Sequence, residues 1–219
     1  MSKELETLYA NRFDETDRAW KDVVWGILWK RVFSRWVPPG AALLDLGAGY
    51  CEFINHAAAR RRIAVDLNPE TARAAAPGVE VHAVSADKLD FLDDGEVGVV
   101  FTSNFLEHLP SKEVLSRVFA EVRRVLQPGG RFILMGPNIR YLADRYWDYF
   151  DHHLPLSHES VVEALLLHGF KPDHVEAKFL PYTVKGSKLR WPLLVEAYLA
   201  LRPLSSGRLG KQFLVSAVS

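Results

Sequence analysis

The sequence contains a single cysteine, Cys51, among its 219 residues. One thiol excludes an internal disulfide and any cysteine-rich zinc site. No apolar run reaches the roughly 18 residues needed to cross a bilayer, and the first residues lack the apolar centre of a secretion signal. We therefore expect a soluble, cytoplasmic protein.

The sequence also lacks a surplus of either charge, because 27 basic residues balance 27 acidic ones. A nucleic-acid-binding protein usually carries a basic surplus, so we expect no nucleic-acid partner. The balance is uneven along the chain, since seven basic residues and one acid, Glu196, lie between Lys178 and the end. This segment predicts either an ordinary solvated surface or peripheral contact with an anionic membrane or substrate.

Short apolar runs alternate with helical patterns from about residue 41 onward. The runs are 42–46, 63–65, 79–84, 97–102 and 132–135. Between the last two, apolar residues recur at helical spacing, with Ser111 as the expected N-cap and Pro128-Gly129-Gly130 as the stop. This alternation predicts an α/β fold in which helices cover both faces of a parallel sheet.

Two regions differ from this alternation. Residues 1–38 predict helix, with an apolar stripe that ends before Pro38. Residues 138–157 are rich in aromatic and histidine side chains and show no clear period. The second region indicates an insertion after the fifth strand.

The C-terminal part predicts a helix at 157–170 and strands at 172–180 and 212–218. The connection at 181–210 is long and contains an almost wholly apolar segment. For this segment we expect a helix that begins at Pro192 and is buried against a pocket or a partner subunit. The alternative is a helix that rests on a membrane.

A glycine-rich turn follows the first strand, where Gly47 and Gly49 precede a segment, 50–60, that predicts a helix. Missing Cβ atoms and the free N–H groups of a helix start favour an anionic or nucleotide ligand. Asp66 ends the next strand 19 residues after Gly47, a spacing typical of a carboxylate that binds ribose hydroxyls. The dinucleotide fingerprint needs a third glycine where this chain has Glu52, which argues against NAD.

Five segments resemble, in order, the motifs of class I S-adenosylmethionine (SAM)-dependent methyltransferases, in particular the type 11 and type 12 small-molecule enzymes. They are Asp45 to Gly49, Asp66, Ser85 to Asp87, Asn104 to Leu109 and Val125 to Phe132. The resemblance covers residues 41–136. It implies a doubly wound, Rossmann-like sheet of seven mostly parallel strands with N-terminal helices and an insertion after strand five.

The resemblance also implies one domain, 1–219, with SAM as its cofactor. A helical cap would span 1–38, the cofactor-binding core 41–136, and the acceptor-side insertion with the last strands 138–219. The residues implied at the cofactor are Tyr9, Arg12, Asp45, Gly47, Ala48, Gly49, Asp66, Leu67, Ala86, Asp87, Asn104 and Phe105. Within this set, the glycine turn would border the methionine end, Asp66 the ribose, Asp87 the adenine, and Asn104 the sulfonium.

Methyl transfer to oxygen requires a base, and histidine suits that role near neutral pH. His108 lies just past the fourth strand, where ligands of open α/β sheets bind, so we predict that it is the base or that it braces this loop. The insertion supplies the predicted acceptor wall. Its residues are Arg140, Tyr141, Trp147, His152, His153 and His158. A divalent metal held by Asp151 and the last three of these is the less favoured alternative, and we predict no metal.

The sequence therefore predicts a SAM-dependent methyltransferase that acts on a hydroxyl of a small molecule or glycan intermediate. N- or C-methylation is the alternative within enzymes. A non-catalytic SAM-binding protein is the alternative outside them, and fold alone does not identify the acceptor. We expect a monomer or homodimer.

Overall fold

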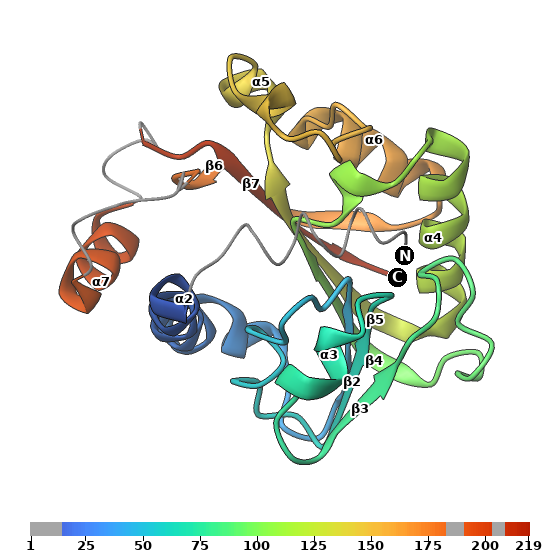
Figure 1. Ribbon diagram of the computed structural model, residues 1–219. Helices are drawn as coiled ribbons and strands as arrows, with labels where there is room; N and C mark the ends of the chain where they lie inside the picture. Colours follow the sequence, from blue (N-terminus) through green and yellow to red (C-terminus); the bar gives the residue numbers. More distant parts are fainter. Residues whose placement is uncertain (1–14, 183–190, 203–208) are drawn as a thin grey trace.

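The computed structural model describes residues 15–182, 191–202 and 209–219. Within these residues seven strands form one sheet in the order β3-β2-β1-β4-β5-β7-β6. The strands are β1 (Ala42–Leu46), β2 (Arg61–Val65), β3 (Val79–His82), β4 (Val97–Ser103), β5 (Leu126–Pro137), β6 (Lys171–Leu180) and β7 (Gln212–Val218). Only β7 runs antiparallel, to both β5 and β6, so the predicted mostly parallel sheet is confirmed (Figure 1).

Helices cover both faces of the sheet. The α-helices are α2 (Glu15–Leu28), α3 (Glu70–Ala74), α4 (Lys112–Val125), α5 (Ile139–Leu142), α6 (His158–Leu167) and α7 (Pro192–Leu201). A π-helical turn, η1 (Trp29–Phe33), and three 3-10 turns, η2 (Ser34–Trp36), η3 (Leu106–His108) and η4 (Tyr146–Asp148), complete the helical segments described. In Figure 1, α4 and α6 lie on one side of the sheet and α2 and α7 on the other.

The central strands are buried on both faces. Leu44 and Leu46 of β1 belong to an apolar cluster with α4 and α6. Leu43 belongs to a second cluster with Phe33 of η1. Because neighbouring side chains of a strand point to opposite faces, burial on both sides requires the continuous apolar runs seen in the sequence.

The predicted helices α4 and α6 both form, α4 with the expected cap and α6 with a capped start as well. The Ser111 hydroxyl accepts a hydrogen bond from the Val114 amide at 3.4 Å, and Ser157 caps α6 in a capping box with Ser160. Such caps contribute about 1 kcal/mol each. α4 ends at Val125 and β5 begins at the next residue, so the expected Pro-Gly-Gly stop falls inside the irregular start of β5.

Residues 50–60, predicted as a helix, form a series of turns instead. Cys51 has a φ of 60°, a left-handed conformation that interrupts a right-handed helix. The Asn55 side chain donates to the Ala74 carbonyl at 2.9 Å and accepts from the Ala76 amide at 2.8 Å. These bonds hold the segment against the end of α3, and the helix prediction was wrong.

α7 begins at Pro192 as predicted, but contacts within this chain do not bury it. Leu193 is 75% exposed and Leu201 is 58% exposed. One side of the helix faces the protein, where the Tyr198 hydroxyl donates to the Phe179 carbonyl at 2.8 Å. Among the described helices, none combines the length and the apolar character needed to cross a bilayer.

Candidate active site

The loop after β1 forms a narrow turn at the carboxyl edge of the sheet. The amides of Gly47 and Ala48 both donate to the Val65 carbonyl, which draws the loop over the end of β2. Gly47 has a φ of 75°, and a Cβ there would lie 2.5 Å from the Phe105 ring. Gly49 has a φ of 53°, and a Cβ there would meet no atom within 4 Å. The position of the Phe105 ring therefore requires a residue without a Cβ at position 47, whereas Gly49 borders open space.

The Asp66 carboxylate lies directly beside this turn. Its Oδ2 accepts from the Gly49 amide at 2.7 Å and its Oδ1 from the Asn68 amide at 2.8 Å. Partial burial raises the pKa of this carboxyl, against the opposing effect of these bonds. Each carboxylate oxygen can accept a second hydrogen bond. The arrangement fits a pair of neighbouring hydroxyls, as the prediction for Asp66 requires.

A depression of about 410 Å³ adjoins the ends of β2 and β3. Its lining residues are Leu67, Ala83, Val84, Ser85, Lys88, Asp90 and Phe91. Leu67 is half exposed there, whereas Ala86 is buried. The Asp87 carboxylate accepts from the Ser85 hydroxyl at 2.6 Å and from the Arg117 guanidinium at 3.0 Å, contacts that lower its pKa. A ligand amino group would share this carboxylate with Arg117.

Asn104 directly follows β4 and has an unusual backbone conformation. Its φ is 48°, its side chain is exposed, and its amide donates to the Met135 carbonyl at 3.0 Å. The left-handed conformation costs roughly 1–2 kcal/mol for most residues, and asparagine tolerates it better than others. Backbone strain of this kind concentrates at functional sites. The strained turn places Asn104 and Phe105 at the same edge as Gly49 and Asp66.

His108 is held by the insertion after β5. Its Nδ1 lies 2.9 Å from the Asp151 carbonyl oxygen and 3.3 Å from a carboxylate oxygen of the same residue. Since a carbonyl only accepts, Nδ1 carries a proton, and Nε2, which lies 4.0 Å from a Glu107 carboxylate oxygen, is the nitrogen that can take one up. A positive charge on His108 would lower the pKa of Asp66, which places the two side chains within electrostatic reach.

Glu107 and His152 lie beside His108. The ligand atoms of these three residues all fall within 4.8 Å of one another, and the two imidazole rings are 5.0 Å apart. Burial raises the pKa of the Glu107 carboxyl. The Glu107 carbonyl accepts from the amides of His153 and Leu154 at 2.8 and 3.1 Å. The insertion is thereby fixed directly over the end of β4.

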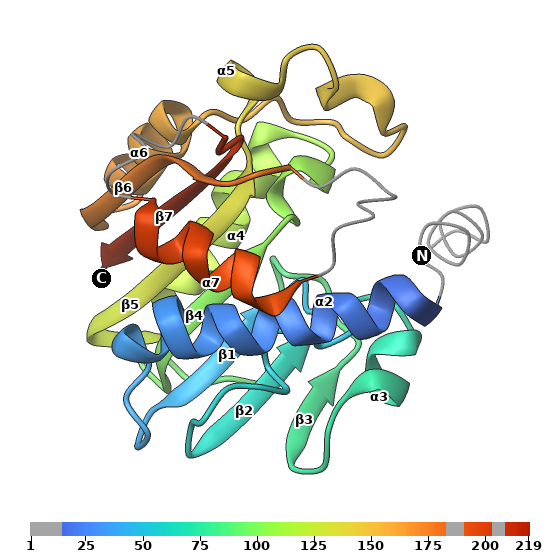
Figure 2. The same cartoon turned by 90° about the vertical axis from the view of Figure 1, so that its left-hand side faces the viewer.

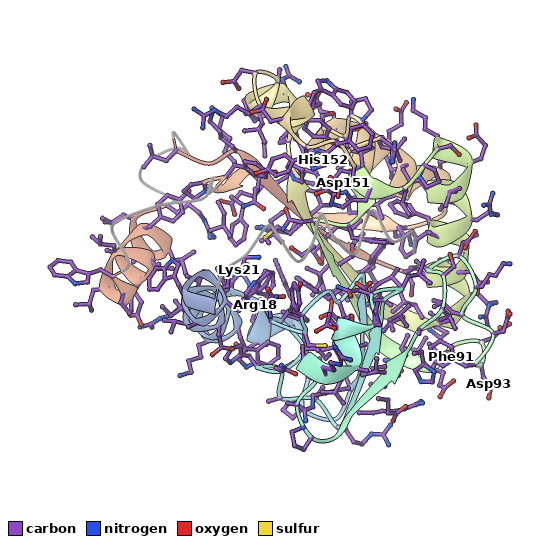
Figure 3. All side chains as sticks on the ribbon, viewed as in Figure 1. Arg18, Lys21, Phe91, Asp93, Asp151 and His152 are labelled. Carbon is purple, nitrogen blue, oxygen red and sulfur yellow. The ribbon has the colours of Figure 1, made fainter. Side chains whose placement is uncertain are left out.

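The histidine set considered for a metal is not brought together as a whole. His153 is exposed, and His158 Nδ1 lies 3.0 Å from the amide nitrogen of Asn138, whereas Asp151 contacts His108. Figure 3 shows Asp151 and His152 next to one another on the insertion. Of the four residues, these two join His108.

Two of the other predicted acceptor residues, Tyr141 and His158, form a second group. The Tyr141 and His158 rings stack at 6.2 Å, and the Lys178 ammonium lies 4.4 Å from the Tyr141 ring centre. Burial lowers the pKa of His158, and Arg140 pairs with Glu159 at 2.5 Å. Trp147 is 56% exposed and packs edge-on against Tyr146. Predicted residues Tyr9 and Arg12 lie outside the described residues.

Sequence reasoning missed two residues that organise the site. Asp151 emerges as the partner of His108, although the sequence suggested it only as a metal ligand. Asn138 is fully buried and caps α5, and its side chain donates to the Ala177 carbonyl at 2.9 Å. The sequence does give a signal for Asn138, because a single asparagine stands directly after a buried strand. No local pattern pairs positions 108 and 151.

Asp45 gives a prediction about stability. It is buried in β1, and burial, with the negative charges of Glu52 and Asp66, raises its pKa well above the usual range. Wild-type stability should fall as pH rises from the unfolded-state pKa through the higher folded-state pKa, by on the order of 1 kcal/mol per pKa unit. Asparagine does not ionise, so the stability advantage of Asp45→Asn should grow between pH 5 and pH 8, as measured by thermal unfolding. A constant or shrinking advantage would contradict this account.

The comparisons with known proteins agree with this geometry. A sequence profile described as a methyltransferase domain matches residues 44–134. A curated relative, an uncharacterised 37.1 kDa protein in transposon Tn4556 of Streptomyces fradiae, is 30% identical over 156 residues. That match covers 65% of this chain and 42% of the relative, so the chain spans less than half of the relative's length.

Solved structures share the fold over nearly the whole chain. A SAM-dependent methyltransferase from Archaeoglobus fulgidus is 18% identical, with 91% of this chain and 94% of that one covered and a TM-score of 0.68. A Haloferax volcanii complex between the Trm112 methyltransferase activator and its methyltransferase also matches at 18% identity. The coverage is 100% of this chain and 98% of that chain, with a TM-score of 0.71.

The sheet order and the glycine turn with its carboxylate define a doubly wound α/β protein with a candidate ligand site at the carboxyl edge of the sheet. Its residues 44–134 match a methyltransferase domain. The fold is that of the solved SAM-dependent methyltransferases that it resembles.

Proposed function

We propose that this protein transfers the methyl group of SAM to a hydroxyl of a small molecule or sugar. The observation that carries the proposal is the orientation of His108 by Asp151 at the same edge as Asp66. SAM, when bound, supplies a methyl group activated by its sulfonium. Asp66 would hold the ribose hydroxyls, and the loop at Gly49 and Asn104 would border the methionine part.

His108 would act on the acceptor. Asp151 keeps the proton on Nδ1, so Nε2 is the atom that removes the hydroxyl proton. The side chain is mostly covered, with 20% of its surface exposed, which limits water at the base but leaves it reachable. Tyr149 stacks on His152 at 5.1 Å and would form part of the acceptor wall.

The test is incubation of the full chain with methyl-labelled SAM and a panel of sugars, phenols and matched amines. Label on a hydroxyl product supports the proposal. Label found only on nitrogen or carbon would show N- or C-methylation and would overturn the proposal of transfer to a hydroxyl. Binding of S-adenosylhomocysteine (SAH) without transfer to any member of a broad panel would favour a non-catalytic SAM-binding protein. The Haloferax neighbour assembles with an activator, so each reaction is repeated with a Trm112-type protein added.

Metal removal gives a second prediction, because Glu107, His108 and His152 could in principle hold a divalent cation. If His108 is the base, dialysis against EDTA should change the methylation rate by less than about twofold, the scatter expected without metal catalysis. Added Mg²⁺ or Mn²⁺ should not raise the rate. A loss that Mn²⁺ restores would show that the three side chains act as ligands, and His108 would then lose its role as base.

A further inference from the structure

Lys178, near the end of β6, carries a positive charge with which no acid pairs in the part of the chain that the structure describes. Its ammonium lies 4.4 Å from the centre of the Tyr141 ring on the insertion. The nearest acid along the strand, Glu176, pairs with Arg202 at 2.7 Å instead. Lys178 is half-buried, so its side chain has lost part of its contact with water, and a bound anion would replace that contact. The position therefore favours a negatively charged ligand.

His158 presents a hydrogen-bond donor beside the same Tyr141 ring, on which it stacks. The amide nitrogen of Asn138 donates to the Ala177 carbonyl at 2.9 Å and lies 3.0 Å from His158 Nδ1. The oxygen of the same amide accepts from the Arg140 backbone at 3.3 Å, which fixes the orientation of the group. Because Nδ1 accepts from Asn138, Nε2 of the neutral ring carries the proton. Burial lowers the pKa of His158 and so favours this neutral form.

The acid next to His158 is already neutralised. Glu159 follows it in α6 and forms an ion pair with Arg140 at 2.5 Å. Tyr141 adds a phenol hydroxyl, which can donate a hydrogen bond. We call Lys178, Tyr141 and His158 the donor group. It combines one positive charge that no described acid balances with further hydrogen-bond donors, which is the composition that binds a carboxylate or a phosphate.

A series of ring contacts joins the donor group to the predicted base. The His108 and His152 rings are 5.0 Å apart. The Tyr149 ring lies 5.1 Å from His152 and 5.9 Å from Tyr182, which follows the end of β6. Figure 2 shows the insertion after β5 and the end of β6 beside one another. An acceptor that lies along these rings would extend from His108 toward Lys178.

We propose that the donor group binds a carboxylate or phosphate carried by the methyl acceptor. The inference rests on the proposed function, because it concerns the acceptor of the same site, and it narrows the acceptor to an anionic hydroxy compound. Lys178, Tyr141 and His158 come from β6, α5 and α6, so the tertiary fold and not a local motif brings them together. Uncharged sugars and phenols would then be poor acceptors.

The experiment compares acceptors that differ in charge, namely hydroxybenzoate with hydroxybenzamide and glycerol phosphate with glycerol. The two pairs also distinguish a carboxylate from a phosphate. For the wild type, kcat/KM should be about tenfold higher for the anionic member of at least one pair, the effect of one charge-assisted contact. Lys178→Gln should remove this preference by raising KM for the anionic member. Lys178→Arg keeps the charge and should retain most of the preference.

Lys171→Gln is the matched control, because Lys171 is an exposed lysine at the opposite end of β6. It should keep the wild-type activity and preference, and every variant should keep the wild-type unfolding temperature. Equal kcat/KM for the two members of both pairs in the wild type would overturn the inference. A preference that survives in Lys178→Gln would also overturn it.

Aminobenzoate and aminobenzamide separate this inference from the proposed function. Transfer to nitrogen alone, with the same dependence on Lys178, would contradict transfer to a hydroxyl and support an anionic acceptor. Calorimetric titration of the SAH-saturated chain with the same pairs gives the answer without turnover. The anionic member should bind with a Kd about tenfold lower, and Lys178→Gln should abolish the difference. Equal Kd values within every pair for the wild type would overturn the inference.

Discussion

Replacing His108 with alanine should lower the methylation rate by roughly 10²- to 10⁴-fold, the usual contribution of a general base. Affinity for SAH should change by less than about twofold, because the base acts on the acceptor and not on the donor. The rate is measured as SAH formed with the acceptor found in the panel screen, and the affinity by calorimetry.

His108→Asn separates a base from a residue that merely braces its loop. The asparagine amide can occupy the position of Nδ1 and donate to the Asp151 carbonyl, but it has nothing in place of Nε2. We expect wild-type stability and a rate as low as that of the alanine variant. A rate close to wild type in His108→Asn would assign His108 a structural role and leave proton removal to another group.

Replacing Asp66 with alanine should weaken SAH binding by about 100-fold or more. A hydrogen bond to a charged group contributes about 1.5–3 kcal/mol, and two such bonds to ribose hydroxyls are lost together. The variant also loses the acceptor for the Gly49 and Asn68 amides, so the turn that borders the ligand becomes less well ordered. The measurement is calorimetric titration at one fixed salt concentration.

Two further variants make the Asp66 result specific. Asp173→Ala removes an exposed acid on β6, at the far edge of the sheet from β2, and should bind SAH like the wild type. Asp66→Asn keeps one oxygen acceptor and should fall between the wild type and the alanine variant. Wild-type affinity in a folded Asp66→Ala protein would remove the ribose assignment.

The main features of the fold could be predicted from the sequence because they rest on local patterns. Continuous apolar runs identify strands that are buried on both faces, and Ser111 and Ser157 mark the starts of α4 and α6 through their own side-chain bonds. The glycine turn follows β1 and Asp66 follows β2. Because these two strands are parallel neighbours, the turn and the carboxylate meet at one edge of the sheet.

The differences arise where distant residues decide the outcome. Cys51 takes a left-handed conformation inside a loop tied to α3, which no helical pattern at 50–60 reveals. The composition of α7 predicts burial, but Leu199 and the Tyr198 hydroxyl hold one side of the helix to the protein and leave Leu193 and Leu201 exposed. The pairing of His108 with Asp151 joins positions 43 residues apart. Each depends on tertiary contacts that a single sequence does not encode locally.

The most direct test of the central claim is calorimetric titration of the purified full chain with SAH, with NADH as the comparison. The geometry at Gly49 and Asp66 predicts micromolar binding of SAH and no measurable binding of NADH. Absence of SAH binding by the folded protein, or binding of NADH in its place, would contradict the assignment of this site to SAM.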